Sequence, residues 1–374
     1  MTSQGRVPNA MARACLDGAA REIAANRPRE AYALAGQAIE ADGDCAATLG
    51  EAGRWMLEAA LFFDETWVAR MVARAELVVL EALALDWSLP VARETIGKIA
   101  AVLCRVDRPH RPEVLELLNL GNERFMAGRF AEAEPHFVRA TKLDPTDATA
   151  HKYLGNTYYN QKRLPEAVFC FRRATELDPL DPQAFKFLAD AHLMLEEHTP
   201  MWRAVYGAIA ANPRYWSAWL MLDRLLAAGG VKMRRFRPSP TALPDLQKNT
   251  ILFDESAPPA TTAVWKQHAT AWIEGARSNA SRHACELAAI TRMNEAITWL
   301  RDNNDAAFRE LDPELRLLPE LTKLGNLRPF VLVIRYEESF RPELEAYKQE
   351  WAKATGDPIE AVQNFLVRTR ARPL

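Results

Sequence analysis

The stretch "HKYLGNTYYNQKRLPEAVFCFRRATELDP" (151–179) is similar to "LLNLGNERFMAGRFAEAEPHFVRATKLDP" (117–145), which lies 34 residues earlier in the chain, and the two align without a gap. Self-similarity at a fixed period indicates a repeat architecture. Two further copies follow at this spacing, with leucine at 120, 154, 188 and 222, alanine at 140, 174 and 208, and proline at 145, 179 and 213. The polar residues of the quoted stretch therefore belong to a repeated unit, and their roles depend on the face of the unit that they occupy.

Each unit has the pattern of two helices joined by a short turn. Apolar and small residues recur at helical spacing on both sides of Gly128, and Asp144-Pro145 follows the second helix. Proline ends that helix because it lacks an amide hydrogen and its ring clashes with the preceding turn. Small residues that let paired helices approach closely are Gly121, Ala133 and Ala140, with Gly155, Ala167 and Ala174 one unit later. The sequence therefore predicts seven helices over 112–230 and little or no strand before residue 240.

These residues resemble tetratricopeptide repeats. The units 114–147 and 148–181 match the family pattern, whereas 182–215 has Met201 and Val205 in place of the usual small and aromatic residues. A fourth first helix begins at Trp216. The resemblance implies a right-handed solenoid of antiparallel helix pairs, whose first helices line a concave groove. We therefore expect an all-α fold with about three and a half repeats over 112–230.

The rest of the chain departs from the 34-residue period. Residues 1–111 contain the second-helix spacing of small residues twice, at irregular distances, which predicts divergent helical hairpins. Residues 231–260 hold five prolines and a basic run, so we expect a linker or extended arm. Residues 261–374 have mainly helical patterns. "PFVLVIRY" (329–336) is the one strand candidate there, with "TILF" (250–253) or another chain as its partner.

Composition narrows the class of protein. The chain of 374 residues is 49% hydrophobic and 26% charged, which is typical of a folded domain. A net charge of −2 argues against nucleic-acid binding, and the basic "VKMRRFRP" (231–238) would give only a weak, salt-sensitive contact. No stretch approaches the roughly 20 apolar residues of a membrane span, and the N-terminal segment lacks the apolar core of a secretory signal. Five widely spaced cysteines without a Cys-x-x-Cys pair suit reduced, buried thiols. We expect a cytoplasmic protein, and its richness in alanine and arginine favours a bacterial source.

Arrangements that carry catalysis are missing from the sequence. It contains no phosphate-binding glycine-rich loop, no Gly-x-Ser-x-Gly turn and no His-Glu-x-x-His motif. The seven histidines form no pairs at i, i+3 or i, i+4 spacing, so a zinc centre is not expected. We therefore predict neither a cofactor nor a metal.

The groove implied by the resemblance is the candidate binding site. By register, the residues that face it are Asn122, Phe125, Lys152, Asn156, Tyr159, Asn160, Lys186, Asp190 and Arg224. Asn122 and Asn156 occupy the same point of consecutive units, where a side-chain amide can pair with a peptide group of an extended ligand. The alternative is that these asparagines bridge helices or are solvated. The groove is mildly basic along a line of three residues, Lys152, Lys186 and Arg224, and Asp190 partly offsets this charge. Such a groove favours a bound segment that is acidic or of mixed charge.

A related role can be set aside from the sequence. Repeats of this family that bind the carboxylate tails of heat-shock chaperones use basic and asparagine residues at five groove positions. Those positions hold Leu118, Asn122, Tyr153, Gln183 and Phe187, so only Asn122 fits.

We predict a non-enzymatic scaffold or specialised chaperone that binds an extended segment of a partner protein. The alternative is an enzyme whose catalytic module lies in the last 130 or so residues, with the repeats selecting its substrate.

Overall fold

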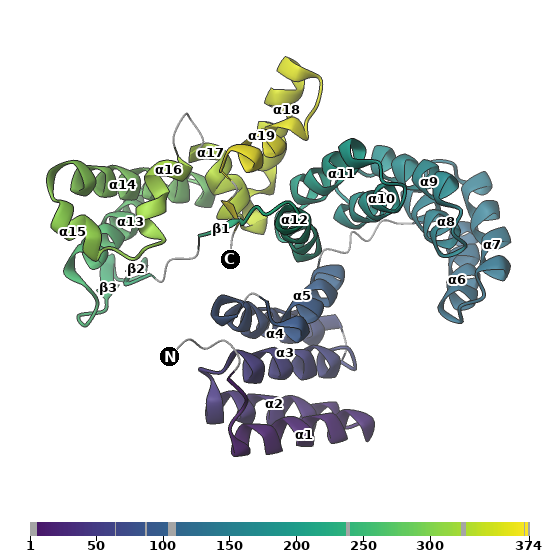
Figure 1. The fold of residues 1–374 in the computed structure, drawn as a ribbon, viewed down its shortest axis with the longest axis horizontal. Helices are drawn as coiled ribbons and strands as arrows, with labels where there is room; N and C mark the ends of the chain where they lie inside the picture. The colour runs from purple at the N-terminus through teal and green to yellow at the C-terminus, as the bar shows by residue number, and fades with distance from the viewer. Residues whose placement is uncertain are drawn as a thin grey trace. The chain divides into compact units, whose positions relative to one another are not determined.

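The computed structural model describes residues 6–63, 65–86, 88–103, 110–236, 240–322, 327–369 and 371–372. Two compact units divide the chain after Leu222, and the second consists of Asp223–Pro373. The described residues are mainly helical, so the expected all-α fold is confirmed (Figure 1). Within the described ranges, strands are confined to two small two-stranded sheets, both in the second unit.

The first unit begins with helices that pack in order along the chain (Figure 1). They are α1 (Ala10–Ala24), α2 (Pro28–Asp42), α3 (Ala46–Ala60), α4 (Glu65–Leu85) and α5 (Pro90–Leu103). Each contacts the next, and α3 also contacts both α1 and α5. Helix α4 is 21 residues long, whereas α1, α2 and α3 have 15 residues each. This longer helix, with α5 after it, is a physical reason for the loss of the 34-residue period in this part of the sequence.

Residues 110–236 contain seven helices, in agreement with the spacing of the sequence, and we call these helices the repeat array. They are α6 (Pro112–Met126), α7 (Phe130–Leu143), α8 (Ala148–Asn160), α9 (Leu164–Leu177), α10 (Pro182–Met194), α11 (His198–Ala211) and α12 (Trp216–Ala228). From α6 to α11, each helix packs on the next, and first helices also contact first helices, α6 with α8 and α8 with α10. This packing places side chains of consecutive first helices next to one another.

The 34-residue period is also present in the backbone. The turn after each first helix has one residue with positive φ, namely Gly128 (72°), Lys162 (64°), Glu196 (58°) and Gly230 (73°). Glycine adopts this left-handed conformation without steric cost, whereas a residue with a Cβ atom is strained there. The turn geometry is therefore a property of the repeat, because the second and third repeats adopt it without a glycine.

Close approach of the paired helices depends on small residues. A Cβ atom on Gly121 would lie 2.5 Å from the Phe137 ring, and one on Gly155 would lie 2.7 Å from the Phe171 ring. In the third repeat (182–215), the corresponding residues are Ala189 and Val205, both buried. The third repeat thus has alanine in place of glycine on its first helix and valine in place of phenylalanine on its second helix. The larger residue compensates for the smaller one, so the total volume stays roughly constant, as close packing requires.

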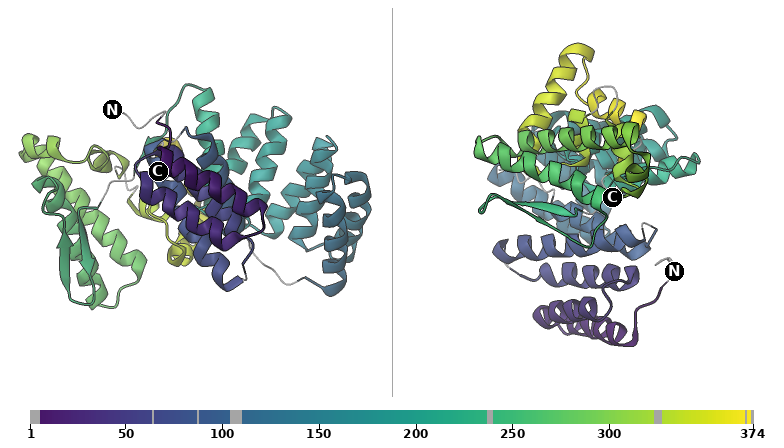
Figure 2. Two further views of the ribbon diagram at one scale, coloured as in Figure 1. Left: turned by 90° about the horizontal axis from the view of Figure 1, so that it is seen from below. Right: turned by 90° about the vertical axis from the view of Figure 1, so that its left-hand side faces the viewer.

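The second unit has its core around two long helices. These are α13 (Pro259–Arg277) and α14 (Arg282–Asn303), which pack on each other. Strands β2 (Ala242–Asp245) and β3 (Thr250–Phe253) form an antiparallel hairpin that contacts α13 (Figure 2). The short strands β1 (Arg234–Arg235) and β4 (Ala371–Arg372) pair in parallel. The remaining helices are α15 (Asp305–Glu310), α16 (Leu318–Leu321), α17 (Leu327–Pro329), α18 (Arg341–Thr355) and α19 (Glu360–Thr369).

Two expectations for the second unit need correction. "PFVLVIRY" (329–336) is not a strand, because Phe330–Ile334 form a π-helix directly after α17. All five of these side chains are buried, at most 5% exposed. A short apolar run buried on every side has the same pattern in a strand and in a helical segment, so periodicity could not separate the two. "TILF" (250–253) is a strand, as expected of the partner, but it pairs with β2, so part of the expected linker is an ordered hairpin.

Candidate functional site

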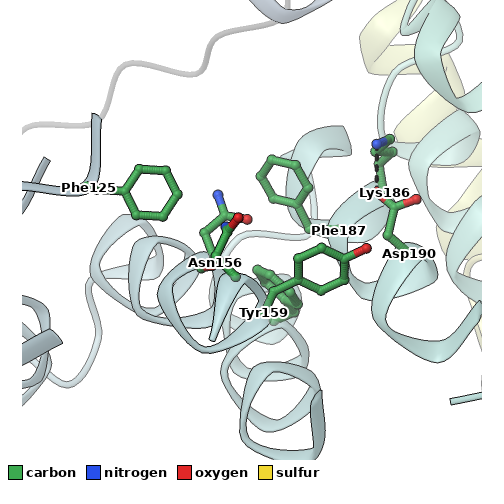
Figure 3. A pocket seen from close by; sticks show the side chains of 8 residues that line it. Phe125, Asn156, Tyr159, Lys186, Phe187 and Asp190 are labelled. Carbon is green, nitrogen blue, oxygen red and sulfur yellow. Dashed lines mark hydrogen bonds and ion pairs between the residues drawn. The ribbon is translucent and has the colours of Figure 1, made fainter. Parts of the chain in front are cut away.

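A pocket of about 320 Å³ opens on the repeat array (Figure 3). Its walls come from three consecutive first helices and one second helix, and its lining residues are Phe125, Asn156, Tyr159, Asn160, Phe171, Lys186, Phe187 and Asp190. Figure 3 shows Phe125 at one end, the pair of Lys186 and Asp190 at the other, and Asn156 between them. We call the side of the array formed by α6, α8 and α10 at this pocket the groove face.

The aromatic walls follow from the repeat. Phe171 of α9 reaches the pocket beneath Gly155, and its ring centroid lies 5.6 Å from that of Phe187 on α10. One unit earlier, Phe137 and Tyr153 make the equivalent contact at 5.5 Å. The aromatic pair is therefore part of the way successive units pack, and its exposed edge gives the pocket an apolar wall.

Both lysines predicted to face the groove are engaged in ion pairs. Lys186 Nζ lies 2.6 Å from Asp190 Oδ2, one turn away on α10, and 5.7 Å from the Phe187 ring centroid. Lys152 Nζ lies 2.6 Å from Asp181 Oδ2, and both of these side chains are 13% exposed. Asp181 also caps α10 by accepting hydrogen bonds from the backbone of Gln183 and Ala184. The two lysines of the basic line expected from the sequence are thus neutralised by carboxylates of the same chain.

Uncharged polar groups complete the pocket. Asn160 Nδ2 donates to the backbone oxygen of Asn156 at 2.8 Å, which orients its amide. Within the described residues, neither the Asn156 amide nor the Tyr159 hydroxyl has a hydrogen-bond partner. Burial, and then the nearby Asp190 carboxylate, raise the pKa of Tyr159, so its hydroxyl keeps its proton. The pocket therefore offers free donors and acceptors without a net charge.

Six of the nine residues predicted from the sequence line this pocket, all of them on first helices. Asn122 is exposed on α6 outside the lining, and Lys152 is held by Asp181. Arg224 is exposed on α12, in the part of this helix that belongs to the second unit, and is not among the lining residues. The nine predicted binding residues do not include Phe171 and Phe187, although Phe187 occupies one of the five groove positions that chaperone-binding repeats use, and Phe171 lies one period after Phe137.

A buried polar cluster occupies the second unit. Glu286 on α14, with its side chain 6% exposed, accepts hydrogen bonds from Trp272 Nε1 at 2.7 Å and Arg335 Nε at 2.9 Å, and His268 Nε2 lies 3.2 Å away. Burial alone would raise the pKa of Glu286, but the hydrogen bonds and charges of His268 and Arg335 outweigh it and hold the pKa well below its usual range. Both carboxylate oxygens thus have protein partners, and the cluster links α13 and α14 to Arg335, the residue directly after the π-helix.

The described parts of the chain carry neither a candidate metal cluster nor a helix that could span a membrane. Those residues include no group of three or more His, Cys, Asp or Glu side chains that could hold a metal ion. Of the helices that they form, none has both the length and the apolar character needed to cross a bilayer. Cys15, Cys45, Cys170 and Cys285 are buried and free, and Cys104 lies outside the described residues.

Comparison with known proteins agrees with the repeat pattern. A tetratricopeptide repeat family model matches residues 124–191, a range that contains all eight residues lining the pocket. Together with the register of the four units, this match shows that this part of the chain carries tetratricopeptide repeats. None of the curated protein sequences matches it significantly.

Several solved structures are similar in fold. MamA from Desulfovibrio magneticus RS-1 is 15% identical, with 55% of this chain and 97% of that chain covered and a TM-score of 0.23. YrrB, described as a tetratricopeptide repeat protein with an unusual peptide-binding site, is 19% identical, with coverages of 58% and 99% and a TM-score of 0.25. The TPR2AB domain of yeast Sti1, in complex with pHSP90, is 16% identical, with coverages of 59% and 99% and a TM-score of 0.30. Because identity and TM-score are low, these similarities carry no information about the partner of this chain.

Proposed function

We propose that this protein is a non-enzymatic interaction protein, a scaffold or specialised chaperone, whose groove face binds an extended segment of a partner protein. The observation that carries the proposal is the pocket, in which α6, α8 and α10 present side chains to one shared space. Consecutive first helices with equivalent residues at regular steps match the periodic backbone of an extended chain. The unpaired Asn156 amide can donate to and accept from a peptide group, so it can bind main chain without depending on side-chain sequence.

The alternative, a catalytic module in the last 130 or so residues, lacks a comparable supporting observation. Its most distinctive polar group, Glu286, is buried and hydrogen-bonded through both carboxylate oxygens, and a general acid or base must reach its substrate. The expected cytoplasmic location and bacterial source belong to the same proposal as the scaffold role. They are supported by composition and by the widely spaced, odd number of cysteines.

Site-specific photo-crosslinking tests the proposal. A photoreactive phenylalanine analogue is introduced at Met126, which is 77% exposed at the end of α6, next to the pocket residue Phe125. The matched control carries it at Phe169, which is 61% exposed on the second helix α9. After irradiation in cells of the source organism, adducts are mapped by mass spectrometry.

We expect adducts at position 126 that map to one linear segment of a partner and are absent at position 169. Adducts that form equally at both positions, or only at the control position, would contradict binding at the groove face. Circular dichroism of both variants confirms that each is folded.

A further inference from the structure

The geometry points to the kind of residue that the pocket selects: a large, uncharged, apolar side chain, aromatic or of leucine or methionine size, projecting from the extended segment. This inference rests on the proposed function, because it assumes that such a segment lies along the groove face. It differs from the acidic or mixed segment expected from the sequence, and the difference comes from the charges of the pocket.

The volume of the pocket fits one such anchor. A cavity of roughly 150 Å³ is large enough for a benzene ring. At about 320 Å³, the pocket has room for an aromatic side chain together with the peptide groups on either side of it. The half-buried rings of Phe125 and Phe187 supply the apolar contact surface, with the buried Phe171 ring behind them, and the Asn156 amide is placed to pair with an adjacent peptide group.

The charges of the pocket exclude an ionised anchor. The Lys186 ammonium is committed to Asp190 at 2.6 Å, so a partner carboxylate would have to displace that internal carboxylate or lie beside it. A partner cation would approach the ammonium itself, which already lies near the face of the Phe187 ring, where a cation would otherwise be attracted. An ionised side chain would therefore lose water without gaining a free counter-ion, whereas an apolar side chain gains from leaving water.

A matched pair of variants tests the pocket. Asn160 and Asn303 are the last residues of α8 and α14, both are exposed, and each donates its Nδ2 to the backbone oxygen four residues earlier. Asn160→Trp places a bulky ring in the pocket, whereas Asn303→Trp makes the same change in the second unit. The two variants therefore differ in whether the pocket is filled.

The probe is a library of random dodecapeptides displayed on phage and selected against the full chain. We expect the selected peptides to share one large apolar residue without an adjacent requirement for Asp, Glu, Lys or Arg. Replacing that residue by alanine should weaken binding roughly 10- to 150-fold, as expected for the loss of a buried large apolar side chain. Asn160→Trp should abolish the binding, and Asn303→Trp should leave it unchanged.

The outcomes separate this inference from the proposed function. Peptides that are lost on Asn160→Trp but depend on a charged residue overturn the apolar anchor and leave groove binding intact. Peptides that bind Asn160→Trp as well as the unmodified chain, or a library without any binder, contradict the proposed function and the inference with it. Melting curves that agree between the two variants show that a loss of binding does not arise from unfolding.

Discussion

Gly155 and Phe171 form a close helix contact beneath the pocket, and their coupling can be measured. In Gly155→Ala, the new Cβ atom would lie 2.7 Å from two carbons of the Phe171 ring and 3.2 Å from Cys170 Cβ. Carbon atoms prefer a separation of about 3.5–4.0 Å, so the ring must move, and such overpacking costs about 1–3 kcal/mol. Alanine recovers about 1 kcal/mol of this through its better helix propensity, which leaves a net cost of up to about 2 kcal/mol.

The same substitution should have the opposite effect when Phe171 is made smaller. Phe171→Val alone leaves a cavity and should cost about 2–3 kcal/mol, less than the roughly 3–5 kcal/mol of a change to alanine. Adding Gly155→Ala recreates the combination that the third repeat has at Ala189 and Val205, both buried. In that background the added methyl group fills space and the helix gains propensity, so stability should rise by about 1 kcal/mol. The predicted coupling between the two substitutions is therefore about 1–3 kcal/mol.

Hydrogen exchange followed by mass spectrometry measures the local opening free energy of α8 and α9 without assuming that the whole chain unfolds in one step. The unmodified chain, both single variants and the double variant complete the cycle. If the effects of the two substitutions add, with a coupling below about 0.5 kcal/mol, the reasoning from packing volume is refuted.

Three further predictions follow from particular residues. Lys162→Gly should stabilise the array by up to about 1 kcal/mol, because lysine at φ 64° is strained. The control Lys142→Gly, within helix α7, should destabilise the array by about 1 kcal/mol. Hydrogen exchange must therefore show changes of opposite sign in the opening free energy of the two variants. Because the pKa of Glu286 is lowered from its usual 4.5 on folding, its contribution to stability is present above pH 4.5 and is lost as the pH falls below it. Glu286→Gln should therefore be less stable than the unmodified chain at pH 7, with a difference in urea unfolding that narrows below pH 4.5, and a constant difference would contradict this. Burial raises the pKa of Cys170 to about 12, so iodoacetamide should alkylate it in urea but barely in the native chain at pH 8; equal rates would show that the thiol is accessible.

The repeat array was predictable from sequence because small and apolar residues recur in it every 34 residues. Leucine at 154, 188 and 222 is buried at equivalent places, and Gly155 is the residue that Phe171 requires. The groove residues followed from the same register, since residues one period apart face the same way. The pattern was weaker in residues 1–111, where α4 is longer than its neighbours and small residues recur at irregular distances.

What the sequence could not provide was the set of contacts between units. Lys152 and Asp181 are 29 residues apart, which is not one period, so the register of the repeat does not reveal their pairing. Phe171 is fully buried, and only the structure shows that its ring also borders the pocket. The run 330–334 is apolar throughout and therefore carries no period that separates a π-helix from a strand.

The central claim is that the groove face binds an extended partner segment through the pocket, and titration calorimetry tests it most directly. The ligand is a synthetic peptide of the segment that crosslinks at position 126, and the variants are Asn156→Ala and, as a control in the second unit, Asn303→Ala. The Asn156 amide can make two hydrogen bonds to a peptide group, each worth about 0.5–1.5 kcal/mol, so its loss should weaken binding roughly 5- to 150-fold. The melting temperature should stay the same, since the amide has no partner within the described residues. The account predicts this loss for Asn156→Ala and an unchanged Kd for Asn303→Ala. An unchanged Kd for Asn156→Ala in a folded protein would contradict it.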